Sequence, residues 1–317
     1  MFKCLLVGAG QLGSRYLQGL AQVEQPLSVQ VVEPSHSSVN LAQQRLADVQ
    51  LSNKVDIQFH ETIEYCSSDY DLAIIATPSH CRPDVVANVN SCCKINGWIL
   101  EKILAQSASE LRRIEQALKF SDRVWVNTPR RIMPWYESIK KELFSTSANL
   151  RSVRVSGGCW GLACNSIHFI DLVSWLSNSQ VRSVSSSDLI KWSKSKRIGC
   201  YEVFGKLNVE FMNQTQLELI CDESDSKLQI EIIASDENWL ISESDGKAIS
   251  SLGHEIVGEL DYQSSLTAPL VHQILTTGYC RLPSLADSAS QHRPLLDSLL
   301  KHWNNSQGIT DLIVPIT

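Results

Sequence analysis

The stretch Phe2–Gly13, FKCLLVGAGQLG, decides the fold of this chain. Its first half is an apolar run that predicts a short buried strand. Three glycines follow at the spacing G-x-G-x-x-G, where a helical pattern begins. Gly8 permits a tight turn, Gly10 lets the backbone approach a ligand, and Gly13 allows the helix to pack closely on the strand. We therefore expect a strand–turn–helix unit at the start of the chain.

Outward from this unit, strand and helix patterns alternate as far as residue 127. Strands are predicted at 2–7, 29–33, 55–59, 72–76, 98–101 and 124–127, and helices over 11–22, 40–49, 83–89 and 107–120. Strands that alternate with helices are typical of a parallel, doubly wound sheet. The fold class expected is therefore α/β, with a Rossmann domain over residues 1–127.

From residue 128 the pattern changes. Helices are predicted over 135–144, 166–176, 264–277 and 284–303, and strands at 206–211, 216–221, 228–234 and 239–242. These strands follow one another without helices between them, which favours antiparallel pairing. We expect residues 128–317 to form a second, α+β domain with a mostly antiparallel sheet, joined compactly to the first.

Composition narrows the possible partners and the compartment. The chain has 317 residues and a formal net charge of −6, which argues against nucleic acids and acidic membranes as partners. A strand pattern follows Met1 directly, without a leader or a membrane span, so we expect a cytoplasmic protein. The ten cysteines include no C-x-x-C pair, which disfavours a zinc ribbon or a thioredoxin-like site.

The glycine loop predicts a dinucleotide site when it is combined with Glu33. This acidic residue ends the second predicted strand, twenty positions after Gly13. Its carboxylate would accept hydrogen bonds from a ribose and repel a 2′-phosphate, and no arginine follows closely enough to offset this. We therefore expect NAD as the cofactor, with NADP less favoured, and expect Gln11 and Leu12 to contribute with the helix N-terminus. The alternative is a capping carboxylate before Pro34.

Two later segments carry candidate catalytic side chains. Glu101 and Lys102 end a predicted strand at the sheet edge where open α/β sheets bind ligands. His168 and Asp171 are three residues apart on a predicted helix, so both project from one face. Each segment also has a simple structural interpretation, either as a solvated strand end or as a histidine in the core.

Taken together, these segments resemble the Gfo/Idh/MocA family of NAD(P)-dependent oxidoreductases, which includes glucose–fructose oxidoreductase and inositol dehydrogenase. The matching pieces are the glycine loop, Ala76-Thr77-Pro78 with His80, Glu101-Lys102, Gly157-Gly158, and His168 with Asp171. The resemblance implies a Rossmann domain and a second domain with an open-faced sheet, through which a homodimer or homotetramer would form. It implies pyranose-like or cyclitol substrates, often nucleotide-linked, and a cofactor-binding role for Thr77, Pro78, His80 and Glu101.

The sequence departs from the family pattern at two positions. Ile103 replaces the proline of the usual Glu-Lys-Pro, although Lys102 is retained. Cys164 stands where the family commonly has an aspartate, four residues before the histidine. The neighbouring Asn165 can bind a substrate hydroxyl, but it cannot supply the negative charge that supports a protonated imidazole or a cationic lysine.

The expected reaction is hydride transfer to or from a secondary carbon of a sugar. His168 would act as general acid and base, since imidazole titrates near neutral pH. Lys102 would stabilise or relay the proton, and Asn165 would position the substrate. Further substrate contacts are expected from four residues: Arg130, Arg131, Cys164 and Asp171. The two arginines could face an anionic group of the substrate, or they could be surface residues of a connecting loop.

Two other functions are compatible with the sequence. The first is a regulatory protein that binds a dinucleotide but has lost catalysis, which the cysteine at position 164 would support. The second is a zinc enzyme built on Cys159, Cys164 and His168. Their ligand types suit zinc, but their spacing matches no standard site and no fourth ligand is evident. We therefore expect no metal.

Overall fold

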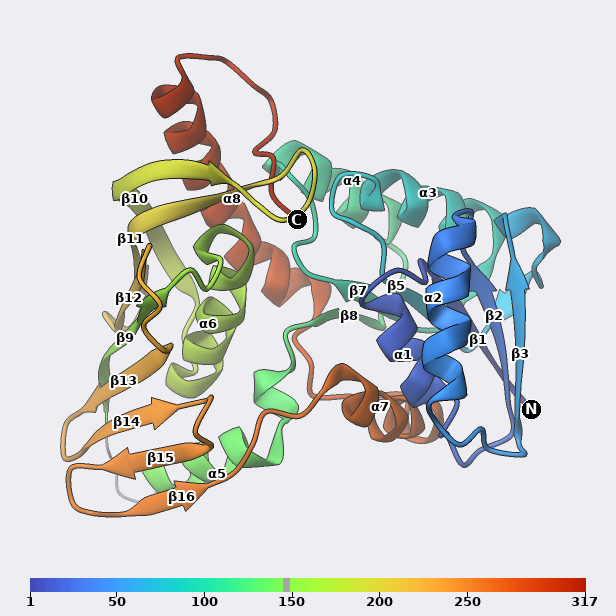
Figure 1. Cartoon of the computed structure of the whole chain (residues 1–317), viewed down its shortest axis with the longest axis horizontal. Helices are drawn as coiled ribbons and strands as arrows, with labels where there is room; N and C mark the ends of the chain where they lie inside the picture. Colours follow the sequence, from blue (N-terminus) through green and yellow to red (C-terminus); the bar gives the residue numbers. More distant parts are fainter. Residues whose placement is uncertain (145–148) are drawn as a thin grey trace. The chain divides into compact units, whose positions relative to one another are not determined.

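The computed structural model describes residues 1–144 and 149–317, which form two compact units (Figure 1). Unit 1 contains Met1–Ala105, Ser109–Asn127 and Asp261–Leu285, and unit 2 contains Gln106–Ala108, Thr128–Leu260 and Ala286–Thr317. The chain therefore returns to unit 1 after residue 260. The domain expected over 128–317 includes 261–285, which the structure groups with unit 1.

Unit 1 is built on a six-stranded parallel sheet, as the alternating pattern predicts. Its strand order is β3-β2-β1-β5-β7-β8. The strands are β1 (Phe2–Val7), β2 (Leu27–Val32), β3 (Val55–His60), β5 (Leu72–Ile75), β7 (Trp98–Glu101) and β8 (Val124–Asn127), and a small separate pair is formed by β4 (Asp69–Tyr70) and β6 (Lys94–Ile95). Because the six strands run parallel, their carboxyl ends share one edge, where the glycine loop begins.

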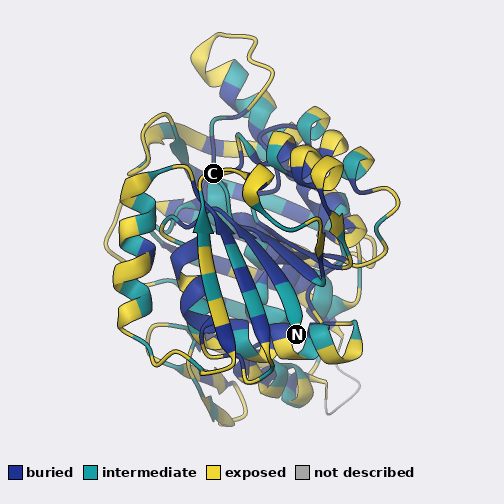
Figure 2. Cartoon of the chain, turned by 90° about the vertical axis from the view of Figure 1, so that its right-hand side faces the viewer, coloured by how far each residue is buried: buried dark blue, intermediate teal, exposed yellow. Residues whose placement is uncertain are grey.

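Four helices of unit 1 lie between its strands in the chain, and a fifth follows the last strand of unit 2. They are α1 (Gly13–Leu20), α2 (His36–Ala47), α3 (Arg82–Cys92), α4 (Ala108–Ala117, whose first residue is grouped with unit 2) and α7 (Gln263–Thr277), with a short 3₁₀ helix, η1 (Ile63–Tyr65). Buried residues concentrate along the strands, whereas exposed residues lie on helix surfaces and loops (Figure 2). Strands β5 and β7 are buried throughout, which explains why their sequences are continuous apolar runs.

Helix α7 packs directly against α1, although about 240 residues separate them in the sequence. Gly19 makes this approach possible, because a Cβ atom there would lie 2.4 Å from the carbonyl oxygen of Ser264 and 2.5 Å from Cβ of Thr267. A larger residue at position 19 would push the helices apart. The last part of unit 1 is therefore supplied by a segment far from the Rossmann pattern.

Unit 2 is built on an eight-stranded sheet with the order β10-β11-β12-β9-β13-β14-β15-β16. The strands are β9 (Leu150–Gly158), β10 (Val181–Lys194), β11 (Tyr201–Phe211), β12 (Gln216–Asp222), β13 (Gln229–Ala234), β14 (Asn238–Ser242), β15 (Lys247–Ser250) and β16 (Glu255–Val257). The sheet is mostly antiparallel, as expected. One pair departs from this pattern, because β9 lies between β12 and β13 and pairs in parallel with β12.

One face of this sheet packs on helix α6 (Leu162–Ser177). Strand β11 alternates buried and half-buried positions, and its buried Leu207 and Val209 belong to the core of unit 2. The remaining helices of unit 2 are η2 (Pro129–Ile132), α5 (Pro134–Leu143) and α8 (Leu285–Gln307). Among the residues that the structure describes, no helix has the length and apolar character needed to cross a membrane.

Candidate functional site

The glycine loop has the local geometry that its sequence predicts. Gly8 follows β1 with φ +91°, a conformation that residues with a Cβ rarely adopt. Gly13 opens α1 so close to the loop that a Cβ atom there would lie 1.9 Å from the carbonyl oxygen of Gly8. These two glycines therefore set the turn and the packing of the helix on the strand.

The loop has the features required to hold a pyrophosphate. A Cβ atom on Gly10 would find no heavy atom within 4 Å, so the backbone at this position is open to a ligand. The first N–H groups of a helix lack partners within the helix, and its dipole favours an anion there. Gly10 lies just before α1 at the carboxyl edge of the parallel sheet. The residues present therefore fit the phosphates of a dinucleotide.

Glu33 ties the glycine loop to the end of β2. One carboxylate oxygen accepts the N–H of Ala9 at 2.8 Å, and the other accepts the N–H of Ser35 at 2.9 Å. The residue is only 9% exposed. Each carboxylate oxygen has a second lone pair, so these two bonds leave capacity to accept from a ribose hydroxyl. The structure thus places a negative charge directly beside the loop.

Arg45 is a residue of this region that the sequence analysis missed. It lies near the end of α2, and its guanidinium donates to the carbonyl of Gln11 at 2.6 Å, to Oε1 of Gln11 at 2.6 Å and to Oγ of Ser14 at 2.7 Å. A positive charge at the start of α1 adds to the attraction that the helix N-terminus exerts on an anion. No local pattern marks Arg45, because the contact joins residues 34 apart.

Arg82 holds together the loops that follow β5 and β7. It is 2% exposed and donates to the carbonyl oxygens of Thr77 and Ile103. Thr77 begins the segment that includes the exposed Pro78 and His80, and Ile103 follows Lys102. The structure therefore brings two of the segments quoted for the resemblance together at one sheet edge. Their individual contacts with a cofactor stay predictions.

Glu101 lies in the interior of unit 1 instead of at a solvated strand end. It is 2% exposed and accepts hydrogen bonds from Tyr16 Oη at 2.5 Å and from Asn127 Nδ2 at 2.6 Å. Burial raises the pKa of its carboxyl, against the lowering effect of these donors. Glu101 thereby links α1, β7 and β8 at the residue before Lys102, and a direct contact with a cofactor stays a prediction.

Helix α6 carries three predicted site residues on one stripe. Cys164, Asn165 and His168 are half-buried, whereas most of the helix around them is buried. The spacing of three to four residues places them on one face. Asn165 donates to the carbonyl oxygen of Trp160 at 2.8 Å, which anchors its side chain near the start of the helix. The structure therefore places these three residues together on α6, and their roles toward a substrate stay predictions.

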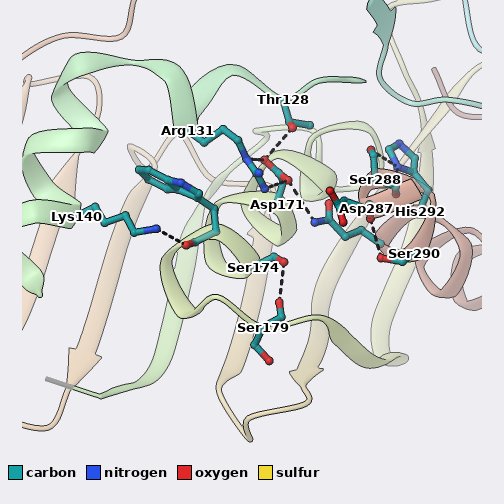
Figure 3. A network of polar contacts seen from close by, with 12 residues as sticks. Thr128, Arg131, Lys140, Asp171, Ser174, Ser179, Asp287, Ser288, Ser290 and His292 are labelled. Atoms are coloured by element: carbon teal, nitrogen blue, oxygen red, sulfur yellow. Dashed lines mark hydrogen bonds and ion pairs between the residues drawn. The ribbon is translucent and has the colours of Figure 1, made fainter. Parts of the chain in front are cut away.

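Asp171 is turned toward the interior of unit 2. It is 1% exposed and accepts hydrogen bonds from Thr128 at 2.8 Å, from Nε of Arg131 at 2.9 Å and from Gln291 at 3.2 Å (Figure 3). Burial raises the pKa of the Asp171 carboxyl, and the Arg131 charge opposes that rise. These contacts give Asp171 a structural role, and its expected contact with substrate stays a prediction.

Glu202 is a second residue that the sequence analysis missed. It lies at the start of β11, accepts the N–H of Ala163 at 2.9 Å and contacts the thiol of Cys164. A carboxylate at the N-terminus of a helix interacts favourably with the helix dipole. Another element of unit 2 therefore places a carboxylate beside position 164. Only the packing of α6 on β11 reveals this contact, since the two residues are 38 positions apart.

Arg130 is also bound to a carboxylate within unit 2. It donates to both oxygens of Glu243 at 2.7 and 2.9 Å, and its guanidinium lies 4.3 Å from the ring centre of Phe169. Burial alone would raise the pKa of Glu243, but the Arg130 charge and the hydrogen bonds from Arg130 and Tyr136 hold it below its usual value. The side chains of Arg130 and Arg131 are each 14% exposed, so neither is a surface residue of a loop.

The three residues considered for zinc differ in exposure. Cys159 is exposed with φ +50°, whereas Cys164 and His168 are half-buried on α6. Across residues 1–144 and 149–317, no group of three or more His, Cys, Asp or Glu residues is arranged to hold a metal ion. The contact of Cys164 is instead with Glu202.

Comparison with known proteins establishes the fold. No protein-family model and no curated protein matches the sequence. Solved structures do match: scyllo-inositol dehydrogenase from Lactobacillus casei with bound NAD(H) and scyllo-inositol has 15% identity and a TM-score of 0.68, with 95% of this chain and 98% of that chain covered. UDP-N-acetylglucosamine 3-dehydrogenase from Acidithiobacillus ferrooxidans has 13% identity and a TM-score of 0.68, with 94% and 95% covered.

A levoglucosan dehydrogenase in complex with NADH is similar over its whole length, with 13% identity, a TM-score of 0.71 and 100% of each chain covered. At these identities the likeness is one of fold, and the chemistry has to be argued from this chain's own residues. The chain thus shares the two-part α/β fold of these structures, with a parallel Rossmann sheet and a mixed, mostly antiparallel sheet.

Proposed function

We propose that this chain is an NAD-dependent oxidoreductase that transfers hydride to or from a secondary carbon of a sugar or sugar derivative. The observation that carries the proposal is the glycine loop at the carboxyl edge of the parallel sheet, with Gly10 open to a ligand and the Glu33 carboxylate beside it. The same fold occurs in dehydrogenases whose names specify scyllo-inositol, levoglucosan and a UDP-linked sugar. Membership of the Gfo/Idh/MocA family is part of this proposal.

NAD rather than NADP is the proposed cofactor. The carboxylate of Glu33 is fixed beside the loop by two backbone N–H groups, so a 2′-phosphate would approach an immobile negative charge. Scyllo-inositol dehydrogenase with bound NAD(H) and levoglucosan dehydrogenase with NADH share the fold. A bound nicotinamide supplies the hydride acceptor or donor, and the remaining steps belong to side chains of this chain.

We assign proton transfer with the reacting hydroxyl to His168, and we assign orientation of its oxygen to Lys102. Imidazole titrates near neutral pH and can accept or return this proton, while an ammonium stabilises negative charge that develops on the oxygen. Asn165 would position the substrate from the same stripe of α6. Glu202 would act as a positioning residue, because its carboxylate fixes the start of the helix that carries His168.

The substrate class is a pyranose-like or cyclitol compound, and a nucleotide-linked form is included in the proposal. Arg130 and Arg131 were candidates for binding an anionic part of such a substrate. Both are already neutralised by a carboxylate, Glu243 in one case and Asp171 in the other. The positive charge available from them for an anionic substrate is therefore reduced, and a neutral sugar unit is the better supported core of the substrate.

We also propose that the protein is a homo-oligomer that assembles through the sheet of unit 2. Leu240 on β14 and Ile249 on β15 are opposite one another in register, and they are 41% and 44% exposed. Apolar side chains placed side by side on a sheet surface favour a protein partner. Light scattering of the purified protein and of Leu240→Lys tests this, and an unchanged mass for the variant would contradict the proposed interface.

The first experiment is absorbance-monitored turnover with NAD and NADP against free, phosphorylated and nucleotide-linked sugars. Lys102→Ala and His168→Ala should each lower kcat by about 100-fold or more while dinucleotide binding is retained. The exposed Lys94→Ala is the matched control and should behave as the unaltered protein. Full turnover by Lys102→Ala would contradict its assignment. Tight dinucleotide binding without turnover on any sugar would favour the regulatory protein considered above.

A further inference from the structure

We propose that unit 2 contains a second binding site, for a small hydroxylated anion such as a sugar acid or a sugar phosphate, at the C-terminal end of α6. A cavity of about 510 Å³ lies there, within the size range of small-molecule sites. Its lining includes Arg131, Lys140, Trp175, Ser290 and Gln291, together with one carboxylate, that of Asp287. This site is independent of the proposed hydride transfer, because none of its residues belongs to the stripe that contains His168.

The cavity has a polar lining to which η2, α5, α6 and α8 all contribute. Figure 3 shows Lys140 of α5 and Ser290 of α8. Trp175 comes from α6, and Gln291 from the early part of α8. Ligand sites for apolar molecules are lined mainly by apolar and aromatic side chains, whereas here the indole of Trp175 is accompanied by amides, hydroxyls, two cations and the Asp287 carboxylate. The lining therefore suits a polar ligand.

Lys140 contributes a positive charge to the cavity. Its ammonium donates to the carbonyl oxygen of Trp175 at 2.6 Å and lies 4.1 Å from the centre of the Trp175 ring. Within residues 1–144 and 149–317, no carboxylate lies within ion-pair distance of it. An ammonium has three donors, so the bond to the carbonyl leaves capacity to bind an anion.

A second cation, Arg131, lines the same cavity. Its Nε and one terminal nitrogen are bound to Asp171, which orients the guanidinium and leaves its other terminal nitrogen outside that ion pair. Burial lowers the pKa of Lys140, and the positive charge of Arg131 lowers it further. Because Asp171 offsets much of the Arg131 charge, Lys140 is the cation that the cavity mainly offers to an anion.

Gln291 adds an acceptor that the described part of the chain does not satisfy. The residue is 2% exposed, its amide nitrogen donates to Asp171 at 3.2 Å, and its Oε1 has no hydrogen-bond partner there. A buried carbonyl oxygen without a donor is costly, and a ligand hydroxyl would remove that cost. The site therefore combines donors for an anionic group with an acceptor for a hydroxyl, which defines the proposed ligand class.

Isothermal titration without dinucleotide tests the proposal with four probes: gluconate, glucose 6-phosphate, inorganic phosphate and sorbitol. Gluconate or glucose 6-phosphate should bind with a Kd on the order of 1 mM or below. Lys140→Gln should weaken that binding about tenfold or more, because it removes a charge-assisted hydrogen bond. Gln291→Met should weaken it by a smaller factor. The matched control is Lys141→Gln, an exposed neighbour on α5 that does not line the cavity.

Each other outcome would overturn a defined part of the proposal. If neither gluconate nor glucose 6-phosphate binds to the folded protein, or if Lys140→Gln binds them as tightly as Lys141→Gln does, the site is wrong. If uncharged sorbitol binds as tightly as gluconate, the site does not require an anionic group on its ligand. If inorganic phosphate binds as tightly as glucose 6-phosphate, the sugar hydroxyls make no favourable contact in the site. Thermal unfolding of each variant separates lost binding from lost folding, since Lys140 also contacts the end of α6.

Discussion

The glycine loop of unit 1 and the start of α6 in unit 2 are both candidate sites, but they are built differently. The loop is shaped by backbone atoms in close contact, such as Gly13 against Gly8. The start of α6 is instead organised by side chains from elsewhere in its unit, with Glu202 on Ala163 and Cys164. A contiguous motif therefore describes the first site well, whereas the second depends on which strands lie beside the helix.

The largest effect is expected where unit 2 relies on a buried ion pair. Arg131→Met should lower the free energy of unfolding by about 3–5 kcal/mol, because it leaves the Asp171 carboxylate buried without its cation. Urea unfolding measures this. The exposed pair of Arg182 with Glu210 is the control, and Arg182→Met should cost less than about 1 kcal/mol. Equal costs for the two variants would show that burial does not distinguish these pairs.

The same variant should change how stability depends on pH. Burial raises the pKa of Asp171 above its value in the unfolded chain, and loss of the Arg131 charge should raise it further. A carboxyl whose pKa is higher in the folded than in the unfolded chain binds its proton more tightly in the folded state. The free energy of unfolding therefore falls as pH rises through the pKa of the unfolded chain. The deficit of Arg131→Met should therefore be smallest in acid and larger at neutral pH. A deficit that is constant with pH would contradict this explanation.

Two glycines of the loop should have different roles, one in dinucleotide binding and one in stability. Gly10→Val should weaken dinucleotide binding by about 100-fold while the melting temperature stays close to that of the unaltered protein, because its Cβ meets only open space until a pyrophosphate approaches. Gly13→Ala should instead lower stability, since its Cβ would collide with Gly8. Fluorescence titration and thermal unfolding measure the two effects. Equal losses of stability would contradict the distinct roles of these glycines.

A carboxylate added at the start of α6 should have a smaller effect on stability. Cys164→Asp restores the aspartate of the family pattern but places it against Glu202, so like charges should cost about 1–3 kcal/mol of stability. Adding Glu202→Gln should recover most of this loss, because one carboxylate is then present instead of two. If Cys164→Asp alone is as stable as the unaltered protein, Glu202 does not lie beside residue 164.

The smallest expected effect concerns cofactor preference. Glu33→Gln should narrow the preference for NAD over NADP by about tenfold, since it removes the charge that repels a 2′-phosphate. The amide oxygen can accept only one of the two backbone N–H groups that the carboxylate accepts, so a modest loss of stability is expected, and thermal unfolding is measured beside binding. The ratio of the dissociation constants for NADP and NAD measures the cofactor preference. An unchanged ratio in the variant would contradict the proposed role of Glu33.

The sequence predicted most of the fold because its signals were local. The alternation of apolar runs and helices to residue 127 and the run of strands after residue 200 correspond to the two sheets. The parallel pairing of β9 with β12 was not predictable, since it depends on where β9 inserts in the sheet. The same limit applies to Glu202, Arg45 and the buried positions of Glu101 and Asp171, which depend on elements distant in the sequence.

The return of α7 to unit 1 has a consequence for the gene. The helix that packs on Gly19 is encoded after most of unit 2, so unit 1 is not complete until residues 261–285 have been translated. A premature stop anywhere from residue 128 to 260 would remove the partner of α1 as well as the end of unit 2. The two units therefore cannot be inherited, trimmed or exchanged as consecutive blocks of coding sequence.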